Sequence, residues 1–299
     1  MLNSAYLCGM QKYKVHGALT AVGMIYGVNY SIAKEVMPHY IQPFGFTLLR
    51  VGAATFLFWC YHFIHGGESI DIKKNLPRLL LCAVLGVSAN QLFFLAGLNL
   101  TSPINAALIM TVTPVLVLLS SALLLKERVT AKKALGIGLG LSGAVLLVLQ
   151  QGESTAQGGM LGDILIFLNA SSYGLYLVLV RPLMQRYKAA TIVKWIFLFG
   201  FFMVLPFGWE EFSSTSWQTI PPLIWLAIIY VVVFTTFVAY MLNAWTLRYV
   251  NSSVVGIYIY LQPIFASFTA VLLQQDQLTP QKLLFSLLIF SGVYLVSRK

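Results

Sequence analysis

The chain has 299 residues, of which 59% are hydrophobic and only 9% are charged, and its formal net charge is +10. A soluble domain carries about 25% charged residues. With a mean hydropathy of +0.81, this composition excludes a water-soluble core and predicts a protein whose solvent is lipid.

Ten apolar runs follow one another along the chain, each near the length of about 20 residues with which a helix crosses a bilayer core. They lie at 17–37, 44–64, 79–98, 104–125, 134–150, 160–180, 192–209, 222–243, 253–273 and 282–297. Backbone groups in lipid must be satisfied internally, and the runs lack the alternation of barrel strands. We therefore predict an all-α integral membrane protein with ten transmembrane helices.

The basic residues are distributed unevenly between the loops. If the N-terminus is cytoplasmic, loops such as 126–133 (KERVTAKK) lie on the cytoplasmic side, whereas the outer loops 150–159 and 209–218 contain no lysine or arginine. Cytoplasmic loops of membrane proteins are rich in these residues. We therefore expect a protein of the cell (inner) membrane with both termini in the cytoplasm. The positive charge then indicates topology, and no nucleic-acid partner is expected.

The chain also repeats itself. Residues 105–130 align with 254–279 at an offset of 149, which pairs Pro114 with Pro263, and Tyr26-Gly27 aligns with Tyr173-Gly174 at an offset of 147. Five spans per copy is an odd number, so the second copy enters the membrane from the opposite side, as in inverted-repeat transporters. We predict two inverted five-helix repeats, 1–152 and 153–299.

Three motifs in this order resemble the ten-helix EamA-type family of the drug/metabolite transporter superfamily. They are Tyr26, Gly27, Asn29, Tyr30 and Lys34 in the first span, Arg50 with Ala53 and Ala54 in the second, and Pro114, Glu127 and Thr130 at the fourth. The resemblance runs from about residue 16 to 297. It implies a carrier of small metabolites, often an exporter, with a central cavity lined by the first, third, fourth, sixth, eighth and ninth helices. The fifth and tenth helices would lie at the periphery.

Polar side chains within the spans are costly in lipid and should face protein or a cavity. The predicted substrate-binding residues are Tyr26, Asn29, Tyr30, Arg50, Asn90, Gln91, Asn169, Tyr173, Tyr176, Tyr240, Asn243, Tyr258 and Gln262, and Asn105 and Tyr260 are further polar candidates. Tyr26, Asn29 and Tyr30 share one helix face. Each asparagine could instead join two helices by a hydrogen bond, and each tyrosine could serve packing or interfacial anchoring.

Arg50 lies about 10 Å deep along its helix at 1.5 Å per residue. Its guanidinium is suited to a substrate carboxylate or phosphate, or alternatively to helix-end carbonyls, and Glu35 is the one carboxylate near its depth. The second copy lacks an equivalent arginine, and Lys194 is nearby but out of register.

Three further residues are predicted to act in gating. Pro114 and Pro263 lie within spans, where a proline removes a backbone hydrogen bond and kinks the helix. Lys34, near the outer end of its helix, can extend its ammonium toward the interface. A static kink and an interfacial lysine are the alternatives.

All nine acidic residues are placed at or beyond helix ends, so we expect facilitated diffusion or exchange without a deep proton-carrying carboxylate. Amino acids are the expected substrates, and a sugar or a phosphorylated metabolite is the alternative. An integral-membrane enzyme or an ion channel is the rival class, although the sequence lacks HExxH and GxSxG motifs. We expect a monomer without catalytic residues, metal or cofactor.

Overall fold

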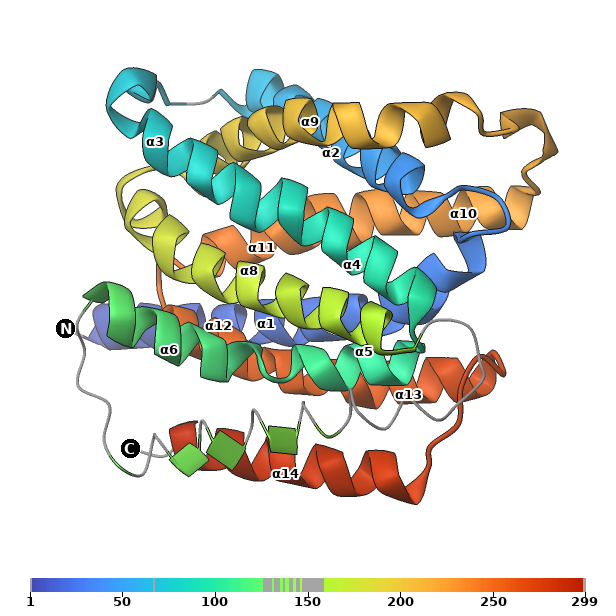
Figure 1. Ribbon diagram of the computed structural model, residues 1–299. Helices are drawn as coiled ribbons and strands as arrows, with labels where there is room; N and C mark the ends of the chain where they lie inside the picture. The colour runs from blue at the N-terminus through green and yellow to red at the C-terminus, as the bar shows by residue number, and fades with distance from the viewer. Residues whose placement is uncertain are drawn as a thin grey trace.

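The computed structural model describes residues 2–66, 68–125 and 159–297, together with residues 131, 135, 136, 138, 139, 142, 143 and 146. All regular secondary structure in these residues is helical (Figure 1). The described part of the chain is therefore all-α, as predicted.

Within the ranges 2–66, 68–125 and 159–297 the helices follow one another with short connections. In the first half they are α1 (Leu2–Val36), α2 (Pro43–His65), α3 (Ile72–Ala83), η1 (Val84–Ser88), α4 (Ala89–Leu100), α5 (Pro103–Met110) and α6 (Thr113–Leu125). In the second half they are α8 (Gly159–Arg186), α9 (Ala189–Ser213), η3 (Trp217–Thr219), α10 (Pro222–Tyr230), η4 (Val231–Val238), α11 (Ala239–Thr246), α12 (Ser252–Ile257), η5 (Tyr258–Leu261), α13 (Gln262–Leu272) and α14 (Pro280–Ser297).

Seven segments of the described chain are long and apolar enough to cross a membrane. They are Pro43–His65, Ile72–Leu100, Pro103–Leu124, Gly159–Arg186, Ala189–Ser213, Pro222–Thr246 and Val254–Leu272. Helices α1 and α14 cover the first and tenth predicted spans but are not among these seven. Most of the fifth predicted span, 134–150, lies outside the described residues. The chain is an integral membrane protein, and the count of ten stays a prediction.

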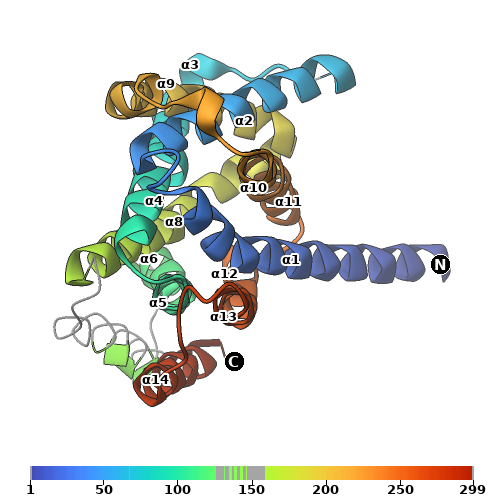
Figure 2. The ribbon, with the colours of Figure 1, turned by 90° about the vertical axis from the view of Figure 1, so that its right-hand side faces the viewer.

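Helices from the two halves pack closely against each other. Helix α2 contacts α9, α4 contacts α8, and α5 contacts α13. Helix α1 packs against α13, and α6 packs against α8. Helix α14 lies at the edge of the bundle in both views (Figures 1 and 2), as expected for a peripheral tenth helix. The centre is thus built by elements of both halves.

Two spans contain a π-helical segment, in which each backbone hydrogen bond joins residues five apart, instead of four apart as in an α-helix. Segment η1 (Val84–Ser88) separates α3 from α4, and η4 (Val231–Val238) separates α10 from α11. Their first residues are 147 positions apart, which is the offset that pairs Tyr26 with Tyr173. The two halves therefore carry the same backbone irregularity at corresponding positions.

Two other spans are broken near a proline. Helix α5 ends at Met110, residues Thr111 and Val112 form a turn, and Pro114 is the second residue of α6. In the second half the 3₁₀ segment η5 precedes α13, where Pro263 is the second residue. A proline is well tolerated there, because the first N–H groups of a helix have no partner within it. Both prolines lie within spans, as predicted, and each lies next to a break in the regular α-helix. A role of these breaks in gating stays a prediction.

A glycine allows each broken span to approach a neighbouring helix. A Cβ at Gly27 would lie 2.6 Å from Cβ of Phe265, and one at Gly174 would lie 3.2 Å from Cβ of Leu116. Each glycine follows a tyrosine, Tyr26 or Tyr173. The Tyr-Gly pairs therefore place a tyrosine beside each broken span.

Candidate functional site

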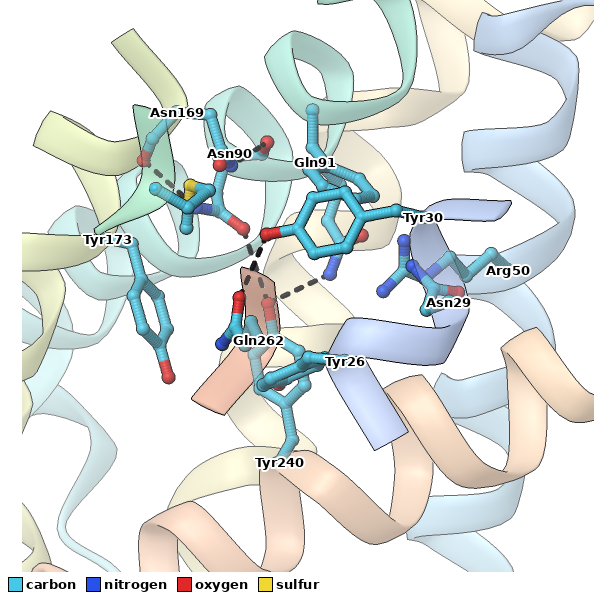
Figure 3. Close-up of a pocket in the computed structure, with 12 residues that line it drawn as sticks. Tyr26, Asn29, Tyr30, Arg50, Asn90, Gln91, Asn169, Tyr173, Tyr240 and Gln262 are labelled. Carbon is cyan, nitrogen blue, oxygen red and sulfur yellow. Dashed lines mark hydrogen bonds between the residues drawn. The ribbon is translucent and has the colours of Figure 1, made fainter. Parts of the chain in front are cut away.

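A cavity of about 50 Å³ lies between α1, α2, α4, α5, α8, α11 and α13 (Figure 3). It is lined by Tyr26, Asn29, Tyr30, Arg50, Asn90, Gln91, Phe94, Met110, Asn169, Tyr173, Tyr240 and Gln262. The first, third, fourth, sixth, eighth and ninth predicted spans all contribute, as the resemblance implies, and the second adds Arg50.

Ten of the thirteen predicted binding residues line this cavity. Asn243 and Tyr258 instead line an adjoining space of about 10 Å³, which also borders Tyr26, Tyr173 and Gln262. Tyr176 lines neither space, because its ring packs over Gly86, where an added Cβ would lie 2.4 Å away. These three residues do not line the central cavity, and their role in substrate binding stays a prediction. A polar residue can thus belong to a helix that lines the cavity and still lie on a different face of that helix.

Two lining residues, Phe94 and Met110, were missed. They are apolar, so their residue type does not distinguish them in a sequence where most residues are apolar. The spacing of Phe94 from Asn90 and Gln91, at three to four residues, was an available signal, because such residues share a helix face.

Segment η1 supplies backbone acceptors to the cavity wall. The hydroxyl of Tyr240 donates to the carbonyl of Gly86 at 2.7 Å and accepts from Nε2 of Gln91 at 2.8 Å. Nδ2 of Asn169 donates to the carbonyl of Asn90 at 2.7 Å, and Nδ2 of Asn90 donates back to the carbonyl of Asn169 at 3.3 Å. These bonds fix α4, α8 and α11 around the cavity (Figure 3).

Tyr30 and Gln262 join α1 to the broken ninth span. The hydroxyl of Tyr30 donates to Oε1 of Gln262 at 2.8 Å, and both side chains are buried. The adjoining space is closed in a similar way, since Nδ2 of Asn243 donates to the hydroxyl of Tyr173 at 3.1 Å. The asparagine and tyrosine side chains therefore connect helices as well as line the space.

Arg50 is held by the second π segment. Its side chain is 3% exposed, and Nε donates to Oγ1 of Thr236 at 2.6 Å. The hydroxyl of Thr236 donates in turn to the carbonyl of Val231 at 2.9 Å, a bond that spans five residues. The guanidinium carbon lies 5.9 Å from the ring centre of Phe94. Thr236 is a third missed residue, because a threonine within an apolar helix gives no sequence signal.

Glu35, the carboxylate expected near the depth of Arg50, accepts a hydrogen bond at Oε1 from Nε2 of Gln275 at 2.5 Å and does not line the cavity. Lys194 also lies away from the cavity, 2.7 Å from the ring of His62. Among the residues that the structure describes, none that lines the cavity around Arg50 carries a carboxylate.

Three buried polar atoms at the cavity lack a hydrogen-bond partner among the described residues. They are Nη1 of Arg50, Oδ1 of Asn29 and Oδ1 of Asn169. Burying such atoms unpaired costs about 1–3 kcal/mol each, and more for a charged group. In Figure 3 Asn29 lies beside Arg50, and Asn169 lies across the cavity. The wall thus presents one cationic donor and two acceptors to a ligand.

Lys34 lies outside the cavity. Its ammonium donates to the carbonyls of Leu98 at 3.0 Å and Asn99 at 3.4 Å, and also to that of Thr101. It therefore satisfies carbonyls at the end of α4, which an α-helix leaves without internal partners. This contact fixes the turn that leads into α5, and a role in gating stays a prediction.

One acidic residue is more deeply enclosed than its place in the sequence indicates. Asp163 lies near the start of α8, but its side chain is 0% exposed and accepts a hydrogen bond from Oγ1 of Thr101. Its Oδ2 has no partner in the described part of the chain. Neighbouring helices therefore enclose one carboxylate in the first turns of α8. The expectation that transport uses no deep proton-carrying carboxylate stays a prediction.

The two other polar candidates also lie outside the cavity. Asn105 lies in the first turn of α5, where its N–H donates to Oγ of Ser102 at 3.3 Å. The ring of Tyr260 packs edge-on against Phe290 of α14 at 5.9 Å. Glu127 and Thr130 lie outside the described residues. The residues that the structure describes contain no cluster of three or more histidine, cysteine or acidic side chains suited to a metal.

Known proteins resemble the chain over most of its length. An uncharacterized transporter, YyaM of Bacillus subtilis (strain 168), is 24% identical over 85% of this chain and 84% of its own. The Arabidopsis thaliana WAT1-related protein At3g53210 is 24% identical over 91% of this chain and 80% of its own. One crystal structure of a protein superposes with a TM-score of 0.65 at 18% identity, covering 93% of this chain and 98% of that chain, and so shares its fold.

The model of the EamA-like transporter family matches residues 15–149 and residues 160–298. These two stretches together include nearly all of the chain, and every residue that lines the central cavity lies within them. The predicted resemblance to the drug/metabolite transporter superfamily is confirmed, and the protein is a membrane transporter: the chain belongs to the EamA-like transporter family.

Proposed function

We propose that this transporter moves amino acids or related small metabolites across the cell (inner) membrane by alternating access, through export or exchange. The main support is the set of buried polar atoms at the central cavity that lack a hydrogen-bond partner among the described residues. Nη1 of Arg50 suits a carboxylate, and the Oδ1 atoms of Asn29 and Asn169 suit the donors of an ammonium group. Aromatic rings of Tyr26, Tyr173 and other lining residues suit an apolar side chain.

The size of the cavity supports a mechanism with distinct states. Ordinary ligand sites measure about 300–1,000 Å³, whereas this cavity of about 50 Å³ has room for only a few water molecules. A metabolite therefore needs a more open arrangement. The breaks before Pro114 and Pro263 and the two π segments are places where a span lacks regular helical bonds, and we propose that the helices rearrange there.

We also propose the ten-span inverted repeat, with both termini in the cytoplasm and a monomer as the working unit. The family model matches each half, and the π segments, helix breaks and Tyr-Gly pairs recur at offsets of 147–149. The loop 214–216 after α9 then lies outside and the start of α3 lies inside. In a cysteine-free background, a membrane-impermeant maleimide applied to cells should label Ser216→Cys and spare Lys73→Cys. The reverse labelling would contradict this orientation.

Counterflow in proteoliposomes tests the proposed substrate class. Vesicles loaded with unlabelled amino acids, sugars or phosphorylated metabolites are given traces of the labelled compound. We expect saturable accumulation for an amino acid. For that compound, its carboxamide and its deaminated acid should each compete at least tenfold less well, because each loses one charged contact worth about 1.5–3 kcal/mol.

The rival functions predict different results in the same vesicles. If only sugars or only phosphorylated metabolites accumulate, that class of compound is the substrate. Conductance without saturation would indicate a channel, and consumption of the compound would indicate an enzyme. Equal competition by the amino acid and its carboxamide would contradict carboxylate recognition by Arg50.

A further inference from the structure

A second polar cavity lies far from the central one along α2, at the end where α2 terminates, α9 begins and α11 terminates (the left side of Figure 1). Its volume is about 300 Å³. Its charged and polar lining residues include His62, His65, Lys188, Thr191 and Arg248, and none of the lining residues in the described part of the chain is acidic. The charge distribution of the sequence predicts that this side faces the cytoplasm.

The beginning of α9 forms one wall of this pocket. Lys188 precedes the helix, and Ala189, Ala190 and Thr191 of its first turn line the space. The N-terminus of a 25-residue helix carries positive partial charge and free N–H groups, which favour an anion. Glu68, the nearby carboxylate, accepts from the backbone N–H of Lys188 at 2.8 Å and takes up one of these donors.

Buried side chains supply an independent sign of a ligand. Thr191 is 1% exposed, and its hydroxyl has no partner within the described chain. Lys194, at 4% exposed, places Nζ 2.7 Å from Nε2 of His62. An ammonium can only donate, so Nε2 accepts and the ring proton lies on Nδ1. That Nδ1 is also buried without a partner among the residues described.

The remaining walls match a membrane interface. Trp245 and Tyr61 line the pocket, and Tyr61 stacks on His65 with ring centres 4.2 Å apart. On the same turn of α2, Phe63 and Ile64 are exposed on the outer surface of the bundle. Amphipathic aromatic rings are typical of the headgroup level, and basic pockets between helices on the cytoplasmic side bind anionic headgroups.

We propose that this pocket is a binding site for a phosphate anion, held by Lys188, Arg248 and the first turn of α9, with Thr191 and His62 as additional donors. The phosphate belongs either to an acidic phospholipid headgroup or to a free phosphate. A binding role here is independent of the substrate cavity, because the two sites share no lining residue.

The test measures the unfolding temperature of the purified full-length chain in a neutral detergent. The probes are dioctanoyl-phosphatidylglycerol, dioctanoyl-phosphatidylcholine and inorganic phosphate. A ligand that binds only the folded state raises this temperature, and we expect a rise of about 3 °C with phosphatidylglycerol or with phosphate, but none with the zwitterionic lipid.

Two pocket variants and one control variant make the result interpretable. The double substitution Lys188→Gln, Arg248→Gln should remove most of the rise, whereas the matched control Lys73→Gln, Lys74→Gln, at exposed sites on the same side, should retain it. Thr191→Val keeps every charge and should lower the rise by about half, so it serves if the double variant fails to fold.

Each outcome decides the proposal. A rise with phosphatidylglycerol alone assigns the site to a lipid headgroup, and a rise with inorganic phosphate assigns it to a free anion. No rise with either probe, or an equal rise in the pocket variants and in the control, overturns the site.

Discussion

In the first half of the chain Arg50 lies at the central cavity, whereas the corresponding residue of the second half, 147 positions later, is Phe197. Phe197 is fully buried and packs against Phe58 and Tyr240, with ring centres 4.8 and 4.9 Å apart. The backbone irregularities of the two halves match, but their side chains do not. Two halves with matching backbone irregularities can therefore differ in side chains at corresponding positions, with the cation on α2 and aromatic packing on α9.

The two broken spans show the same contrast. The amide Oε1 of Gln262, beside Pro263, accepts a hydrogen bond from the hydroxyl of Tyr30 on another helix. Thr113, at the matching position beside Pro114, donates instead to the carbonyl of Met110 in its own span at 2.7 Å. Only the second-half break thus contributes a polar side chain to the cavity wall. Substitutions at paired positions can test whether the halves differ in function as they do in contacts.

The largest effect is expected at Arg50. Arg50→Gln should lower the specificity constant for a carboxylate substrate by about 10- to 100-fold, because a charged hydrogen bond contributes about 1.5–3 kcal/mol. Counterflow at varied substrate concentration measures this change. Arg78→Gln, at an exposed site on α3, is the control and should transport normally. A variant at Arg50 that is folded and as active as wild type would rule out the carboxylate contact.

The next effect compares the two helix breaks. Gln262→Leu leaves the buried hydroxyl of Tyr30 without its acceptor, so we expect transport to fall by about tenfold. Thr113→Val removes only a bond within its own span and should change transport by less than about threefold. Uptake is measured together with the unfolding temperature, to separate function from folding. Equal losses at both positions would contradict the one-sided wall.

A third comparison concerns the two glycines. Gly27→Ala places a methyl group 2.6 Å from Cβ of Phe265 and 2.8 Å from the carbonyl of Gln262, and overpacking of this kind costs about 1–3 kcal/mol. Gly174→Ala meets its nearest neighbour at 3.2 Å, and the helix propensity of alanine, about 1 kcal/mol better than glycine, offsets that strain. The unfolding temperature should therefore fall clearly for Gly27→Ala and change little for Gly174→Ala. The opposite order would show that the α1–α13 contact adapts more easily than its counterpart.

The smallest effects are expected at the prolines. Pro114→Ala and Pro263→Ala each change the second residue of a helix, where proline is tolerated, so stability should change by less than about 1 kcal/mol. If the breaks take part in alternating access, the turnover rate should change by a few-fold in both variants while the affinity stays the same. Time-resolved counterflow measures both quantities. Unchanged turnover in both variants would assign these prolines to static packing.

The sequence by itself determined the features that depend on local pattern and on the lipid solvent. Long apolar runs had to be helices, because lipid offers no hydrogen bonds to the backbone. The spacing of Tyr26, Asn29 and Tyr30 placed them on one face, and the cost of polar groups in lipid pointed that face toward the interior, where all three line the cavity.

Only the tertiary structure decided the features that depend on neighbours distant in sequence. The ring of Tyr176 turns away because Gly86 leaves room for it, and Asp163 is enclosed because another helix end covers it. The π segments and helix breaks recruit Thr236, Gly86 and Gln262 as partners for Arg50, Tyr240 and Tyr30. No local pattern specifies such pairings, because each one forms only when helices from both halves of the chain have packed.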